Sequence, residues 1–139
     1  MYLLDTVTVS ELRRPEKMSA GLAAWAKRSA PSAQFISAIT IFEIEHGVLM
    51  MERRDADQGR VLRTWVDTVL VPKFAGRVLS VNAGVARQCA ALHVPDPKPE
   101  RDSLIAATAL VHRLTVVTRN VRDFEPMGVR LLNPWAISE

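Results

Sequence analysis

Short apolar runs alternate with longer stretches of helical periodicity along the whole chain. The runs that we predict to be β-strands are Tyr2–Leu4, Phe35–Ser37, Arg77–Val81, Leu114–Thr118 and Val129–Leu132. Between them, apolar residues recur three or four positions apart, which is typical of amphipathic helices. Strands that alternate with helices favour right-handed crossovers. The pattern therefore predicts an α/β fold with a mostly parallel central sheet flanked by helices on both faces.

Polar residues and prolines predict where the helices begin and end. Thr40 is a candidate N-cap for a long helix, with Glu43 three residues later as in a capping box. Asn82 is suited to cap a helix that runs to about His93, and Asp102 begins an alanine-rich helix. The predicted breaks are Pro15, the pair Asp55 and Asp57, Pro72, and the proline-rich loop Pro95–Pro99.

Length and composition describe one globular domain, residues 1–139. A chain of 139 residues is long enough for one hydrophobic core and too short for two ordinary domains. With 48% hydrophobic and 24% charged residues, it is not expected to be disordered. No apolar run approaches the ~18 residues needed to cross a bilayer. Because Met1–Asp5 also lacks the basic segment of a signal peptide, we expect a cytoplasmic protein with no membrane partner.

Acidic and polar residues recur where predicted strands end and predicted helices begin. These positions are Asp5 after the first strand, Glu43 and Asp102 in early helical turns, and Asn120 and Asp123 after the fourth strand. In open α/β sheets, such positions meet beyond the carboxyl ends of the strands. Carboxylate oxygens are the usual ligands of hard cations such as Mg²⁺ and Mn²⁺, and a bound cation relieves the repulsion between them. The pattern therefore predicts a divalent-metal site.

Each of these residues also has a structural explanation. Asp5 can cap the turn that follows it, and Glu43 can complete a capping box. Asp102 gains from the dipole of its helix, while Asn120 and Asp123 are common loop residues. The occurrence of four such positions at one predicted edge is what favours the metal site.

Other residues that often form sites are predicted to be structural. Cys89, the only cysteine, lies in an apolar helical run and is expected to be a buried, unreactive thiol. The three histidines lack the spacing of a zinc pair. Trp25, Trp65 and Trp135 are expected to be core or interface residues rather than stacking platforms for bases. The chain has no phosphate-binding glycine motif of the P-loop or Rossmann type.

The net charge of +3 matters mainly through the position of three arginines. Arg101, Arg119 and Arg122 adjoin the acidic positions. A basic surround of a small acidic site suits a polyanion whose phosphate must reach a metal ion. A solvated, charge-balanced surface is the alternative explanation of the same composition.

Four segments, in this order along the chain, resemble those of PIN-domain ribonucleases. They are Leu3-Leu4-Asp5-Thr6 with Ser10-Glu11, Ser37–Ile44 with Gly47, Asp102–Ala109, and Thr118–Phe124. More narrowly, the chain is similar to VapC toxins of type II toxin–antitoxin modules. Phe74–Leu79 and Asn133-Pro134-Trp135 resemble the FitB-like branch.

This resemblance implies a compact PIN-like α/β domain with an endoribonuclease site that depends on Mg²⁺ or Mn²⁺. The implied catalytic set is Asp5, Glu43, Asp102, Asn120 and Asp123. Asp5 and Asp102 are implied metal ligands, and the fourth acidic position is Asp123 or Asn120, with Asp123 favoured as the carboxylate ligand and Asn120 as a polar ligand or orienting residue. Thr6 and Thr118 are implied supports of the carboxylates, and Arg101, Arg119 and Arg122 are candidates for steering RNA. The implied partners are a VapB-like antitoxin, an RNA substrate and a second copy of the chain in a homodimer.

The sequence departs from the family pattern after the first strand. The family usually has Asp-Thr-Asn there, whereas this chain has Asp5-Thr6-Val7. The missing asparagine amide favours an alternative, a catalytically impaired PIN-like domain that binds RNA or a protein partner. A small phosphohydrolase acting on free nucleotides is a third, weaker hypothesis.

Overall fold

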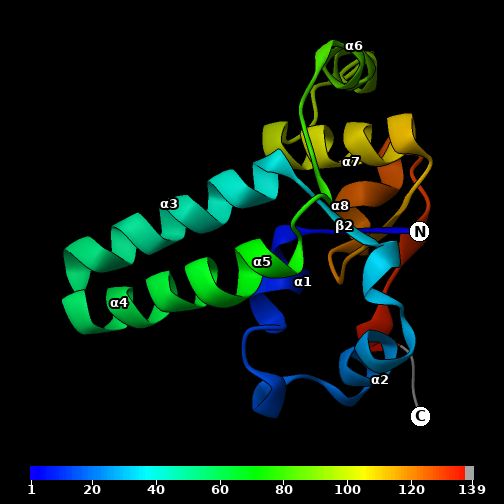
Figure 1. The fold of residues 1–139 in the computed structure, drawn as a ribbon. Coiled ribbons are helices and arrows are strands. Elements are labelled where there is room, and N and C mark those ends of the chain that lie inside the picture. Colours follow the sequence, from blue (N-terminus) through cyan, green and yellow to red (C-terminus); the bar gives the residue numbers. More distant parts are fainter. Residues whose placement is uncertain (137–139) are drawn as a thin grey trace.

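The computed structural model describes residues 1–136 and contains a parallel sheet of five strands at its centre (Figure 1). The strand order is β3-β2-β1-β4-β5, and every neighbouring pair runs parallel. The strands are β1 (Tyr2–Leu4), β2 (Gln34–Ser37), β3 (Val78–Leu79), β4 (Thr115–Val117) and β5 (Leu131–Leu132). The predicted α/β fold with a parallel sheet is confirmed.

The strands at the two edges of the sheet are shorter than the sequence predicts. We expected β3 to cover Arg77–Val81 and β5 to cover Val129–Leu132, but each contains only two residues. An edge strand pairs with one neighbour only, so its length depends on that neighbour's register. β3 pairs through Ile36 and Ser37 of β2, and the helix that begins at Ala38 ends this pairing.

Helices make up most of the remaining chain. Their bounds are α1 (Thr6–Glu11), α2 (Ala20–Arg28), α3 (Ala38–Arg54), α4 (Ala56–Trp65), α5 (Val71–Lys73), α6 (Ala83–Leu92), α7 (Glu100–His112) and α8 (Val121–Phe124). As predicted, Asn82 caps α6, because its side chain accepts a hydrogen bond from Val85 N at 2.9 Å. No helix among the described residues 1–136 is long and apolar enough to cross a membrane.

Two predicted helix ends are wrong. The cap of α3 is Ser37, which accepts a hydrogen bond from Ile39 N, so the helix begins before Thr40. Pro72 does not end the helix that begins at Ala56. A π-helical segment, Val66–Leu70, continues α4 into α5, and Pro72 lies in the first turn of α5, where proline is tolerated.

The hydrophobic core lies on both faces of the sheet, as adjacent residues of β1 show. Leu4 packs with residues of α1, α2 and α3, including Val9, Leu22 and Ile44. Leu3 points the opposite way and packs with α7 and α8, where Ile105 and Phe124 are buried. Alternation along a strand sends neighbouring side chains to opposite faces. The predicted helices on both faces are therefore confirmed, and α6 forms a further layer against α7.

The α3–α4 hairpin extends beyond the sheet to one side of the molecule (Figure 1). Its two helices approach closely at Gly59, which is buried against Glu52. Arg63 of α4 also forms two hydrogen bonds with the Glu45 carboxylate of α3, at 2.8 and 2.7 Å. The small residue and the ion pair add to the apolar packing of Val48 and Leu62 in holding the two helices side by side.

Candidate active site

Asp5 is held at the carboxyl end of β1 by Thr8. Asp5 is only 4% exposed and caps α1, accepting hydrogen bonds from Thr8 N at 2.9 Å and from Thr8 Oγ1 at 2.6 Å. Thr8 Oγ1 also lies 2.8 Å from the carbonyl oxygen of Val117. The cap that the sequence offered as an alternative explanation of Asp5 is therefore present. Only Oδ1 takes part in these bonds.

Glu43 enters the same region from the second turn of α3. Thr6 Oγ1 donates a hydrogen bond to Glu43 Oε1 at 2.6 Å, and it lies 3.0 Å from the Thr40 hydroxyl. Thr6 therefore fixes one oxygen of the Glu43 carboxylate. Because α3 begins at Ala38, Glu43 is not part of a capping box and its side chain is free to turn toward α1.

Asp102 lies in the first turn of α7, where three other carboxylates act on it. Its pKa is raised above the ordinary value, first by burial and then by the negative charges of Asp123, Glu43 and Asp5. Repulsion of this kind requires each of the three carboxylates to lie near Asp102. The structure thus brings together the four acidic positions that the sequence assigned to one edge of the sheet.

The pKa of Asp5 is raised as well, and burial is the largest cause. The hydroxyls of Thr118 and Thr8 and the backbone N–H of Thr8 act in the opposite direction, because they stabilise the ionised form. The Glu43 charge adds to the rise. Burying a carboxylate beside other carboxylates is energetically unfavourable. A purely structural role would not explain this arrangement, because it provides no cation to relieve the repulsion.

The turn after β4 places Thr118, Asn120 and Asp123 next to this cluster. Thr118 is buried, and its hydroxyl accepts a hydrogen bond from Asn120 N at 2.9 Å. Asp123 lies in the first turn of α8, and its backbone N–H donates to the Asn120 carbonyl. Asp123 is thus the residue of this segment whose carboxylate acts on Asp102, while Asn120 shapes the turn.

A buried polar cluster fixes the start of α7. His93 Nδ1 accepts a hydrogen bond from Lys98 N at 3.2 Å, so Nε2 carries the proton that faces Ser103 Oγ at 3.0 Å. Ser103 Oγ in turn donates to the Glu100 carbonyl at 2.7 Å. The buried thiol of Cys89 lies 3.4 Å from the same hydroxyl, which confirms its predicted burial. This cluster positions the turn that carries Asp102.

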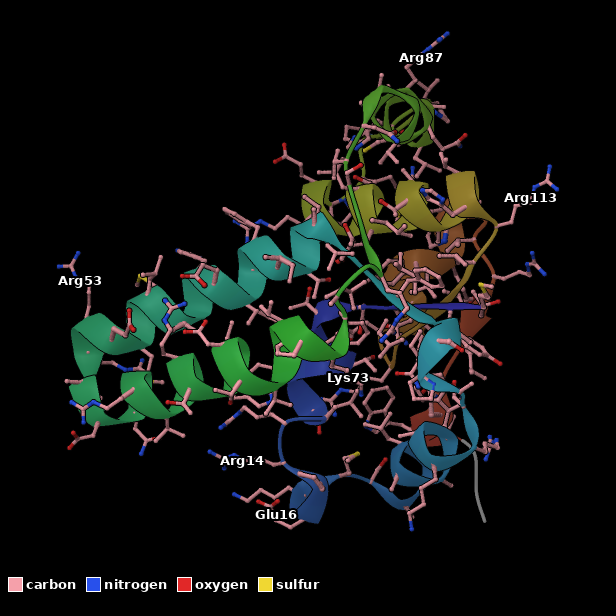
Figure 2. The ribbon with its side chains drawn as sticks, viewed as in Figure 1. Arg14, Glu16, Arg53, Lys73, Arg87 and Arg113 are labelled. Atoms are coloured by element: carbon pink, nitrogen blue, oxygen red, sulfur yellow. The ribbon has the colours of Figure 1, made fainter. Side chains whose placement is uncertain are left out.

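Two of the three arginines predicted to steer RNA form ion pairs within the chain. Arg101 Nη1 lies 3.5 Å from Glu43 Oε2, and Arg119 Nη1 lies 3.4 Å from Glu11 Oε1. Arg122 is exposed. Other cations point outward from distant elements, including Arg53, Arg87 and Arg113 (Figure 2). Of the three arginines, Arg101 is the one whose ion pair is with a carboxylate of the acidic cluster.

The donor set suits a hard divalent cation, although the carboxylates are not gathered in ligand positions. Within residues 1–136, no three His, Cys, Asp or Glu side chains are spaced to hold a metal ion as they stand. Mg²⁺ usually binds through one or two carboxylates and keeps several waters, so it does not need three protein ligands. The all-oxygen donors and the mutual repulsion at Asp102 both fit such an ion.

Sequence reasoning missed Thr8, which makes more hydrogen bonds to Asp5 than any other residue. The signal was present, because Asp5 and Thr8 have the spacing at which an N-cap bonds the third residue of its helix. Val7, in contrast, lines an open groove with Ser10 and Arg14. Thr8, the residue after Val7, gives Asp5 two hydrogen bonds.

Comparisons with known proteins agree with this arrangement. A family model described as PIN domain matches residues 2–128. The chain is 34% identical to VapC ribonuclease Y4jK of Sinorhizobium fredii, over 97% of this chain and 98% of that protein. It is also 34% identical to Toxin FitB of Neisseria gonorrhoeae, over 97% and 99% of the two chains.

The fold has a close counterpart among solved structures. The crystal structure of FitAcB from Neisseria gonorrhoeae contains a chain that superposes with a TM-score of 0.89 at 32% identity. The match covers 99% of this chain and 100% of the other. With the family model and near full-length relatives in agreement, the chain belongs to the PIN-domain family.

Proposed function

We propose that this protein is a metal-dependent endoribonuclease and the toxin of a toxin–antitoxin module. The observation that carries the proposal is the raised pKa of Asp102, caused in part by Asp123, Glu43 and Asp5. The charges of these three residues, which come from three other elements, all act on Asp102, and this supports an acidic cluster at the carboxyl edge of the parallel sheet. The relationship to proteins named VapC ribonuclease and Toxin FitB supports RNA as substrate.

In this proposal, Asp5, Asp102 and Asp123 hold Mg²⁺ or Mn²⁺. The bound cation would supply a water of lowered pKa and neutralise the charge that grows on the phosphate. Thr8 orients the Asp5 carboxylate through two hydrogen bonds to Oδ1. Glu43, fixed by Thr6, accepts a proton from the attacking water, and Asn120 orients the turn that carries Asp123.

The acidic cluster is bordered by grooves that suit a protein partner. One groove of about 190 Å³ runs between α1, α3 and α4, and its walls include Glu43, Thr6 and Trp65. A second, of about 310 Å³, shares Thr6 and Ser10 with the first. A VapB-like antitoxin segment lying there would cover Glu43. We also propose a homodimer, for which the exposed Val69 and Val71 beside these helices are candidate contacts.

Cleavage of single-stranded RNA in Mg²⁺ or Mn²⁺ tests the proposed activity. We expect internal cuts with the native protein, no cleavage in EDTA, and a loss of at least 100-fold for Asp102→Asn. Glu100→Gln is the matched control, because it removes the same charge from an exposed position two residues away in the same turn. Full activity in EDTA, or equal effects of the two variants, would overturn the metal mechanism.

The toxin role has a separate test in cells. Induced expression is expected to arrest growth, Asp102→Asn is expected to abolish the arrest, and co-expression of the adjacent small reading frame is expected to relieve it. Unaffected growth with a protein that cleaves RNA in vitro would leave a ribonuclease that is not a toxin.

The second candidate function is a PIN-like domain that binds RNA without cleaving it. Val7 at the family's asparagine position and the Arg101–Glu43 ion pair favour it. The cleavage assay distinguishes the two functions, because a binding domain retains RNA without producing internal cuts.

A further inference from the structure

An aromatic pair lies on the surface directly beside Glu43. Phe42 and His46 occupy successive turns of α3, and their rings are nearly parallel, at 14°, with centroids 6.0 Å apart. Phe42 is 51% exposed, whereas phenylalanine side chains are more often buried in the core. Neither ring belongs to the clusters that form the hydrophobic core of residues 1–136.

Arg101 joins this pair to the acidic cluster. Its guanidinium carbon lies 4.8 Å from the centre of the Phe42 ring, and its Nη1 lies 3.5 Å from Glu43 Oε2. Figure 1 shows the start of α7, which carries Arg101 and Asp102, beside the start of α3. The aromatic pair and the proposed catalytic carboxylate of Glu43 lie on α3. The guanidinium of Arg101, in the first turn of α7, contacts both Phe42 and Glu43.

We propose that Phe42 and His46 form a stacking platform for an unpaired base of the RNA substrate, next to the phosphate that is cleaved. Every base has an aromatic face, so stacking on a ring is tolerant of sequence and needs a base that is free of a duplex. Arg101 lies over one face of the Phe42 ring, and it belongs to the platform because a guanidinium plane can itself stack on a base and bind the adjoining phosphate. The inference rests on the proposed function and adds a preference for single-stranded RNA.

The composition of the surface favours a nucleic acid base over an apolar protein contact. The edges of the platform carry charge from Arg101 and Glu43. The tryptophans do not offer an alternative platform. Trp25 is buried, and Trp65 and Trp135 pack against the core, as the sequence predicted.

Binding of a fluorescently labelled single-stranded 12-mer RNA to the inactive Asp102→Asn protein in Ca²⁺ tests this platform. We expect Phe42→Ala to weaken binding about 5- to 150-fold, the range measured when a stacking aromatic is removed, and Phe42→Trp to preserve it. Leu49→Ala is the matched control, since Leu49 is 49% exposed on the same helix, and it should bind normally. The same RNA in a duplex should bind to the Phe42→Ala protein and to its parent with equal affinity.

Abasic substitution shows whether Phe42 acts through a base. Removing one base of the 12-mer should weaken binding to the parent by the same factor as Phe42→Ala and should have no further effect on that variant. Equal losses in both proteins, or a Phe42→Ala protein that binds like Leu49→Ala, would overturn the platform. If native protein cleaves RNA and these losses are absent, only the platform fails. If the losses appear but no cleavage occurs, the platform stands and the ribonuclease proposal fails.

Discussion

At the residue scale, the carboxylates of the site repel one another, and threonine hydroxyls hold two of them in place by hydrogen bonds. Asp5 and Asp102 have raised pKa values because they are buried near other carboxylates. Thr8 and Thr6 hold Asp5 and Glu43 in place through hydroxyl bonds of 2.6 Å. This combination is typical of functional sites, where charges are kept together at some cost to the stability of the fold.

The raised pKa of Asp102 predicts how stability depends on pH. When a carboxyl pKa is higher in the folded state, the folded state binds more protons, so stability falls as pH rises from the ordinary value of 3.8 through the raised value. Asp102→Asn should remove this part of the decrease and be the more stable protein at neutral pH without divalent cations. The gain should stay below about 1 kcal/mol, because Asp102 is partly exposed and solvent screens its charge.

Urea unfolding of both proteins at several pH values measures this effect. Glu100→Gln again serves as control, and it should follow the native profile. A native protein that gains stability between pH 4 and 7 relative to Asp102→Asn would contradict the proposed repulsion.

At the element scale, most helices and strands could be predicted because the local signals agree with the fold. Asn82 and the loop Pro95–Pro99 illustrate this agreement. The π-helical segment that continues the helix toward Pro72 could not be predicted. Packing of Val66 and Leu70 in the core overrides the tendency of proline to end a helix. The pairing of Arg101 with Glu43 joins residues far apart in sequence, and no local pattern indicates it.

Two glycines of the α3–α4 hairpin predict opposite effects of the same substitution. A Cβ added at Gly59 would lie 2.6 Å from Glu52 Cα, so Gly59→Ala must separate the helices and should destabilise by about 1–3 kcal/mol. A Cβ at Gly47 meets nothing within 4 Å, so Gly47→Ala should stabilise by about 0.5–1 kcal/mol through helix propensity alone. Thermal unfolding of the two variants compares them directly, and shifts of the same sign would show that the hairpin is not packed as described.

At the scale of the whole molecule, topology places the site. Parallel strands have their carboxyl ends at one edge, so the sequence could place Asp5 and the turn containing Asp123 on the same edge, and the pairing of β1 with β4 makes them neighbours there. The sequence could not show the distribution of the cations. Arg87 of α6 and Arg113 at the end of α7 point away from the body of the molecule (Figure 2).

This distribution predicts which arginines matter for RNA. Arg122, in the first turn of α8 one residue from Asp123, should contact a phosphate, whereas Arg87 should not. Arg122→Ala should weaken binding of single-stranded RNA and lower the slope of log affinity against log salt by about 0.7, the value for one phosphate contact. Arg87→Ala should leave both unchanged. Binding measured between 50 and 200 mM salt compares the two, and equal slopes for all three proteins would exclude Arg122 from the RNA path.

The most direct test of the central claim is calorimetric titration of the protein with Mn²⁺. Our account predicts saturable binding to the native chain, at least tenfold weaker binding to Asp102→Asn, and native binding to Glu100→Gln. The four carboxylates would then be acting together on one cation. A native protein that does not bind Mn²⁺, or an Asp102→Asn protein that binds it equally well, would contradict the account.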